Sequence, residues 1–155
     1  MSFWLLFLHL VGACIWVGGH LYLVLRVLPT AVREKNSQLL LAFEASFEKL
    51  GITALMVQIA TGLYMAHVFL PRWAMLMDYH NPIAILIAMK LTWLVLTILT
   101  ALSAQLLVIP KVKKDINNTA LRRTFIAHIS IVTLLCLAFV ATGVMFRTGV
   151  AWLSP

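Results

Sequence analysis

Residues 83–109 read IAILIAMKLTWLVLTILTALSAQLLVI, and this stretch decides the class of the fold. Lys90 is its only charged residue. About 20 apolar residues in a helix cross the roughly 30 Å hydrocarbon core of a bilayer, so the stretch predicts a transmembrane helix. Three further apolar runs, at 3–28, 50–70 and 124–146, are near or above that length. Pro29, Pro71, Pro82 and Pro110 are expected to mark the ends of these helices.

The composition of the whole chain agrees with this prediction. Its 155 residues are 63% hydrophobic and 11% charged, with a mean hydropathy of +0.99, whereas soluble domains are about half apolar and a quarter charged. Backbone groups in lipid must be satisfied within the segment, which favours helices over strands. We therefore expect an all-α integral membrane protein, a four-helix antiparallel bundle forming one domain over residues 1–155. A large soluble catalytic domain is excluded.

The positive charge is placed between the apolar runs. The formal net charge is +7, but a nucleic-acid interface needs basic residues on a continuous wet surface, so no nucleic-acid partner is expected. Segments 29–49 and 110–123 carry most of the basic residues and are predicted to be cytoplasmic. Both termini then lie on the outer side, periplasmic in a bacterial inner membrane. Residues 38–49 are expected to extend the second helix as an amphipathic segment.

Four histidines fall within or near the apolar runs, where polar side chains are expensive and usually face the bundle interior. His9 and His67 are predicted in the outer leaflet, and His20 and His128 in the inner leaflet. His9 and His20 are eleven positions apart, which places them within about 20° of one helix face and roughly 16 Å apart along the axis. Structural hydrogen bonding is the alternative role for each histidine.

Two imidazoles at each of two depths predict two stacked b-type haems, one on His9 and His67 and one on His20 and His128. No C-x-x-C-H motif for covalent attachment is present. Lys90 and Arg147 are predicted partners for the propionates of the outer haem, although Lys90 can also extend to the outer interface. Glycines on the same helices suit either a flat macrocycle or close helix contact.

A copper site is the alternative reading of the ligand-type residues. Met75, Met77 and His80 lie within six positions of the loop before the third run. Thioether and imidazole are soft ligands that suit Cu(I), although methionine also serves as ordinary packing. Other polar residues in the spans are expected to bond between helices, namely Gln58, Thr61, Thr92, Thr97 and Thr100.

Three motifs resemble the small four-helix members of the copper-resistance protein D (CopD) family. These are W-V-G-G-H at 16–20, G-x-x-x-L-x-x-Q-x-x-T-G at 51–62 and F-x-x-x-G-V-x-F-R ending at Arg147. The resemblance covers nearly the whole chain and implies copper transport or tolerance, with a periplasmic copper carrier as partner. A more distant resemblance to bacterial b-haem-binding membrane protoporphyrinogen oxidases rests on His9, the 16–19 segment and Lys90, and implies a haem-dependent oxidoreductase.

The sequence thus favours a di-haem cytochrome b that moves electrons across the membrane, exchanging them with quinol or a periplasmic redox protein. Copper binding or transport is the second hypothesis. An oxidoreductase acting on a porphyrin or quinol is the third. A homodimer is compatible with each of them.

Overall fold

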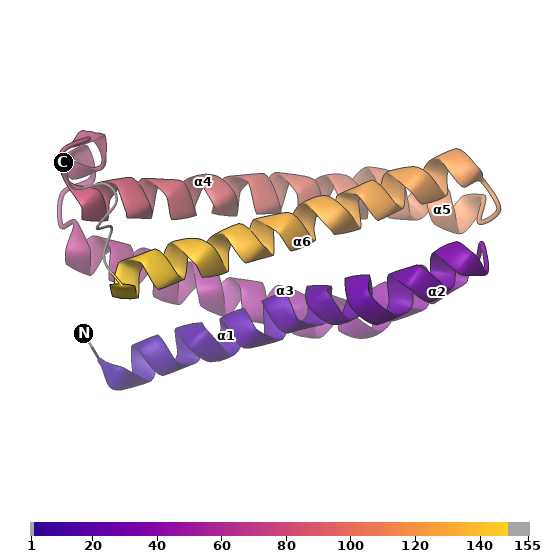
Figure 1. The fold of residues 1–155 in the computed structure, drawn as a ribbon, viewed down its shortest axis with the longest axis horizontal. Coiled ribbons are helices and arrows are strands. Elements are labelled where there is room, and N and C mark those ends of the chain that lie inside the picture. The colour runs from indigo at the N-terminus through magenta and orange to yellow at the C-terminus, as the bar shows by residue number, and fades with distance from the viewer. Residues whose placement is uncertain (1, 149–155) are drawn as a thin grey trace.

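The computed structural model describes residues 2–148, which form four long helical segments (Figure 1). The first segment joins α1 (Phe3–Tyr22), η1 (Leu23–Val27) and α2 (Leu28–Arg33) without a break, and the second is α3 (Ser37–Phe69). The third joins α4 (Pro82–Ser103), η3 (Ala104–Val108) and α5 (Ile109–Lys114), and the fourth is α6 (Thr119–Thr148). A short turn of helix, η2 (Trp73–Met77), lies between the second and third. The expected all-α four-helix bundle is confirmed.

All four segments have the length and composition to cross a membrane, so the protein is a multi-pass membrane protein in contact with lipid. They contain 30 to 33 residues, or about 45–50 Å of helix, which exceeds the roughly 30 Å of hydrocarbon. The predicted spans are shorter because hydropathy detects only the part that crosses the apolar layer. The largest difference is in α3, which begins at Ser37 because residues 38–49 continue the helix, as expected for an amphipathic extension.

The prediction that Pro29 and Pro110 end their helices is wrong. A proline has no N–H to bond the carbonyl four residues back. Each of these prolines follows a five-residue π-helical segment, η1 or η3, in which the bonding shifts by one residue. The N–H of Leu28 bonds the carbonyl of Leu23, and the helix continues past the proline. Pro71 and Pro82 do mark boundaries, since α3 ends at Phe69 and α4 begins at Pro82.

Three helices begin at an asparagine whose side chain caps the first turn. Asn36 accepts from the N–H of Gln38 at 2.9 Å, and Asn81 accepts from Ile83 at 3.0 Å. Asn118 accepts from the N–H groups of Ala120 and Leu121 at 3.0 and 3.1 Å. These bonds satisfy donors that have no partner within the helix, so α3, α4 and α6 start at fixed positions.

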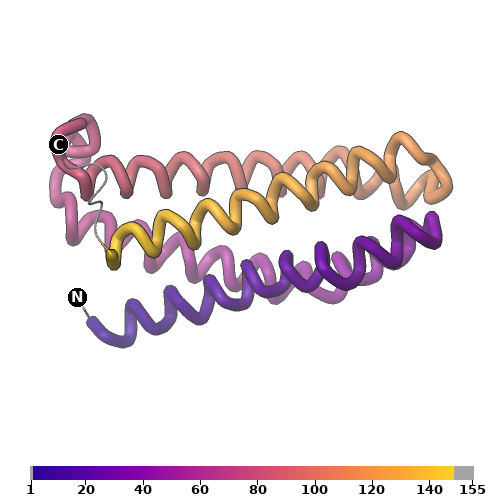
Figure 2. Tube along the Cα trace, viewed as in Figure 1, coloured from indigo at the N-terminus to yellow at the C-terminus, as the bar shows by residue number. Residues whose placement is uncertain are grey.

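The bundle consists of two helix pairs. α1 packs most extensively against α3 and α4 against α6, and the pairs meet mainly through α1 and α6. In Figure 2, α1 runs along the lower edge of the view and α4 along the upper edge. Although α3 and α4 are consecutive, they make few contacts along their length. Two apolar clusters join the second helical segment to the third, one near each end of α3. The first contains Ala66, Leu70, Ala84 and Ile87, and the second includes Leu40, Leu41, Val108, Ile109 and Val112.

Most basic residues lie in one half of the bundle. Within residues 2–148, all lysines and arginines except Arg72, Lys90 and Arg147 belong to the half that contains the turns at 34–36 and 115–118. We call this half the cationic half. The start of α1 and the end of α6 lie at the opposite end (Figure 1). Arg122 donates to the carbonyl of Lys35 at 3.0 Å and thereby joins the two cationic turns.

Candidate functional site

His20 of α1 and His128 of α6 line one pocket in the cationic half, which we call the His20–His128 pocket. Its volume is about 160 Å³. Most of its wall is apolar or aromatic, and the aromatic residues on it are Trp16, Phe43, Phe47 and Phe125. The polar side chains on the wall, besides the two imidazoles, are Glu44, Glu48 and Gln105. The structure therefore brings together the two histidines that were predicted at the inner depth.

Both imidazoles of this pocket are held in the same way. Nδ1 of His20 lies 2.8 Å from the carbonyl of Trp16, and Nδ1 of His128 lies 2.8 Å from the carbonyl of Thr124. A carbonyl only accepts hydrogen bonds, so Nδ1 carries the proton in each ring and Nε2 keeps a lone pair. Metal-binding histidines are commonly oriented by this kind of bond. Nε2 of His128 also lies 3.1 Å from the hydroxyl of Ser103.

The space between α1 and α3 beside His20 is filled by the ring of Phe47. A Cβ added to Gly19 would overlap this ring, and one added to Gly51 would come within 2.9 Å of it. The rings of His20 and Phe47 meet edge to face, with centroids 6.0 Å apart. The two glycines thus form a groove that holds an aromatic ring.

The pocket matches a b-type haem in its donor set but not in its volume. The donor set fits, because two imidazoles that each keep a lone pair on Nε2 share an apolar, aromatic wall, although Nε2 of His128 is bonded to Ser103. The volume of about 160 Å³ is below the roughly 300–1,000 Å³ of most organic-ligand pockets. A macrocycle therefore requires side chains of the pocket wall to move.

His9 lies in the opposite half and packs against α3. The hydroxyl of Thr61 donates to the carbonyl of Val57 at 2.5 Å, so its oxygen accepts from Nδ1 of His9 at 2.8 Å. The amide of Gln58 donates to the carbonyl of His9. A Cβ on Gly62 would come within 3.3 Å of the imidazole. Nε2 of His9 is thus also left as an acceptor.

Lys90 interacts electrostatically with His9. Its Nζ lies 5.1 Å from the centroid of the Phe146 ring, a cation–π contact. A Cβ on Gly143 would lie 3.7 Å from this Nζ. Arg147 is exposed. Lys90 is therefore placed inside the bundle with His9, whereas Arg147 is on its surface.

His67 is not brought to His9. It is exposed, and its ring lies 6.5 Å from that of Trp73 in η2. Thr61 and Gly62, which contact His9, precede His67 by six and five positions, or about 120–140° around α3. In this arrangement His67 faces away from the side of α3 on which His9 lies.

The residues of the copper alternative do not converge. Met75 packs against the apolar cluster of Ala66 and Ile87, while Met77 is exposed. His80 is also exposed, and its backbone N–H donates to the carboxylate of Asp78 at 3.0 Å. Within residues 2–148, no group of three or more histidine, cysteine, aspartate or glutamate side chains is placed to hold a metal ion. Copper binding stays a prediction.

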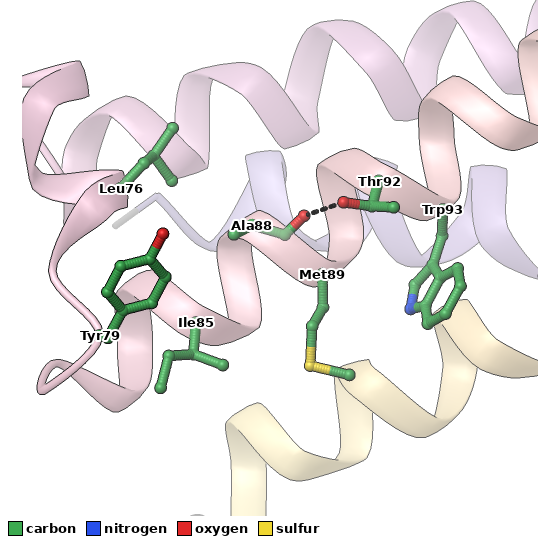
Figure 3. Close-up of a pocket in the computed structure, with 7 residues that line it drawn as sticks. All are labelled: Leu76, Tyr79, Ile85, Ala88, Met89, Thr92 and Trp93. Carbon is green, nitrogen blue, oxygen red and sulfur yellow. Dashed lines mark hydrogen bonds between the residues drawn. The ribbon is translucent and has the colours of Figure 1, made fainter.

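A second hollow lies beneath η2 along α4 and has a volume of about 250 Å³ (Figure 3). It is lined by Leu76, Tyr79, Ile85, Ala88, Met89, Thr92 and Trp93. The hydroxyl of Thr92 is bonded to the carbonyl of Ala88, and the indole N–H of Trp93 is bonded to Thr142. No histidine or acidic residue lines this hollow in the described structure, and it brings together none of the predicted site residues.

The polar residues within the spans divide into two groups. Gln58 and Thr61 bond across to His9, which confirms the expected interhelical bonding. Thr92 and Thr100 instead bond carbonyls of their own helix, and the buried hydroxyl of Thr97 has no hydrogen-bond partner among the described residues, so the expectation is wrong for all three. A threonine hydroxyl reaches the carbonyl four residues back more readily than it reaches a neighbouring helix.

Glu44 and Gln105 were missed as members of the site. The amide of Gln105 donates to Oε1 of Glu44 at 2.6 Å and joins η3 to α3. Gln105 was detectable as a lone amide in an otherwise apolar run. Glu44 was not, because its sequence context is that of a solvated first turn of a helix.

Comparison with known proteins gives no matching family model, no similar curated protein and no similar solved structure. The arrangement of the side chains is therefore the basis for the function proposed below.

Proposed function

We propose that this chain is a membrane-embedded electron-transfer protein of the b-type cytochrome class, with a haem between His20 and His128. One observation carries the proposal. Two imidazoles from different helices line a single pocket, and each is fixed through Nδ1 to the carbonyl four residues earlier. Each imidazole thus keeps Nε2 as a possible ligand, and two such imidazoles could hold the iron of one b-type haem.

The chain's own residues would position the haem and surround it with apolar side chains. The carbonyls of Trp16 and Thr124 orient the two imidazoles, and the hydroxyl of Ser103 would have to leave Nε2 of His128 for that nitrogen to hold the iron. The aromatic side chains make much of the wall apolar. The bound haem supplies one-electron redox chemistry at a potential set by this environment.

A second haem in the opposite half has one candidate ligand in place. His9 has a free Nε2 and Lys90 is near enough to pair with a propionate. Because His67 faces away, this haem would need a different second ligand or a rotation of α3. The stoichiometry of haem per chain distinguishes one site from two.

The test is a reduced-minus-oxidised optical spectrum of the detergent-purified protein, with a pyridine haemochrome assay and elemental analysis for iron and copper. We expect the sharp alpha band of a low-spin b-type haem. His20→Ala and His128→Ala should each abolish the band of the haem in the His20–His128 pocket. His80→Ala, in the exposed loop, is the control and should keep it.

Two results would contradict the proposal. One is the absence of a Soret band from protein purified with haem supplied during expression. The other is an unchanged spectrum in His20→Ala. Stoichiometric copper without haem would favour the copper hypothesis instead.

A further inference from the structure

Five basic residues lie on either side of the turn that joins α5 to α6. We call them the α5–α6 basic cluster, and they are Lys111, Lys113, Lys114, Arg122 and Arg123. Asp115 is the one acidic residue in 111–123, and its carboxylate accepts from the side-chain amide of Asn118 at 3.1 Å. Arg122 is half-buried, and the other four members are exposed. The turn therefore carries a concentrated positive charge at the surface of the cationic half.

The protein itself neutralises little of this charge. Within residues 2–148 the one salt bridge joins Arg33 to Glu34 in the neighbouring turn, with 3.6 Å between Nη2 and Oε1. Arg122 donates to the carbonyl of Lys35, and the side chains of the other four members make neither a hydrogen bond nor an ion pair in the described structure. Neighbouring like charges repel one another unless an anion lies near them. The cluster is therefore complementary to an anion that the chain does not supply.

The stability of the helices explains only part of the cluster. The three lysines lie in the last turn of α5, where the helix dipole favours positive charge. Arg122 and Arg123 are instead the fourth and fifth residues of α6, near a helix N-terminus, where the dipole disfavours positive charge. The first turn of α6 contains no acidic residue. An anion held at the turn would offset the unfavourable position of the two arginines.

The surface beside the cluster is apolar. Leu106 and Leu107 of η3 are exposed, as is Leu102 of α4 one turn further from the cluster. Leu107 precedes Lys111 by four positions, so the two exposed side chains are about one helical turn apart. The segment Pro82–Lys114 is long and apolar enough to cross a membrane, and its exposed leucines contact lipid chains. A helix surface that is first apolar and then cationic matches a phospholipid, in which acyl chains lead to a charged headgroup.

We propose that the α5–α6 basic cluster binds the headgroups of anionic phospholipids, with the acyl chains lying along Leu106 and Leu107. A zwitterionic headgroup is neutral because its phosphate is accompanied by an ammonium group, whereas phosphatidylglycerol brings a negative charge that the cluster can neutralise. A free phosphate ion shares the headgroup chemistry but gains nothing from the leucines. The inference goes beyond the proposed function and requires no haem.

The test is electron paramagnetic resonance of the full chain in phosphatidylcholine bilayers that contain a trace of spin-labelled phosphatidylglycerol or spin-labelled phosphatidylcholine. The immobilised fraction of each label gives the relative affinity of the two lipids for the protein surface. One basic residue beside an anionic headgroup gives about a fivefold preference. We expect wild type to prefer phosphatidylglycerol by about fivefold or more at low salt, and to lose most of this preference at high salt.

Two triple variants separate the cluster from the general charge of the cationic half. Lys111→Gln, Lys113→Gln and Lys114→Gln together should lower the preference at least fivefold. The matched control combines Arg26→Gln, Arg33→Gln and Lys49→Gln, which remove the same charge from the same half outside the cluster, and it should keep most of the preference.

Four results would overturn the inference. These are equal affinities for the two lipids in wild type, an unchanged preference in the cluster variant, an equal loss in the control, and displacement of the labelled lipid by inorganic phosphate at constant ionic strength. The last would show a site for a soluble anion. If the cluster variant does not assemble, the salt dependence of wild type decides, since a preference that persists at high salt contradicts binding by exposed charges. None of these outcomes changes the haem spectrum, so the inference and the proposed function fail independently.

Discussion

Gly18 and Gly19 are neighbours in sequence but have different surroundings. A Cβ on Gly19 would overlap the Phe47 ring, whereas one on Gly18 would meet no atom within 4 Å. Phe47 has little room to yield because it is packed against His20, Phe43 and Gly51. We expect Gly19→Ala to destabilise the protein by about 1–3 kcal/mol, the usual cost of overpacking.

Gly18→Ala is the matched control for this substitution. Alanine favours a helix interior over glycine by about 1 kcal/mol, so Gly18→Ala should leave stability unchanged or raise it. Thermal unfolding of the two variants in one detergent, followed by circular dichroism, compares them directly. Equal midpoints for both variants would contradict the packing of Phe47 between Gly19 and Gly51.

At the residue scale, the sequence predicts the depth of each histidine in the membrane but not the neighbouring helix that its side chain faces. Depth follows from counting along a helix, and it brought His20 and His128 to the same pocket. Direction depends on how each helix is rotated against its neighbours, and it separates His67 from His9. The bond between Glu44 and Gln105 joins residues 61 positions apart, and no local pattern reports such a contact.

At the scale of a helix, the start of α6 depends on Asn118. Its side chain accepts from two backbone N–H groups and donates to Asp115 at 3.1 Å. Asn118→Ala should cost about 1 kcal/mol, as expected for loss of an N-cap. Asn117→Ala is the control, since Asn117 is exposed and makes no such bonds in the described structure. Thermal unfolding measures both, and a larger loss for Asn117→Ala would show that α6 is capped elsewhere.

Helix boundaries show where sequence reasoning works at this scale. Pro82 correctly predicted the start of α4, because a proline needs no donor in the first turn of a helix, and the structure adds Asn81 as the cap of this turn. The same rule wrongly predicted that the helix ends at Pro110. A π-helical segment precedes this proline, and the helix continues beyond it. The shift in backbone bonding accommodates the missing N–H of the proline, and hydropathy does not record it.

At the scale of the whole molecule, the distribution of charge predicts its orientation. The cationic half is expected on the cytoplasmic side. In a background carrying Cys14→Ser and Cys136→Ser, Tyr79→Cys should react with a membrane-impermeant maleimide added to intact cells. Asn117→Cys should react only after the membrane is opened. The reverse labelling pattern would invert the topology and place Glu44 near the outer surface.

The division into two helix pairs has a consequence for biosynthesis. α1 and α3 are made first and form a close interface with each other, and α4 and α6 do the same later. The contacts between α3 and α4 are few, so α1 and α3 can pack together before α4 is synthesised. Each pair can leave the translocon as a closed hairpin, and the loop around η2 then acts as a tether that brings two finished halves together in the lipid.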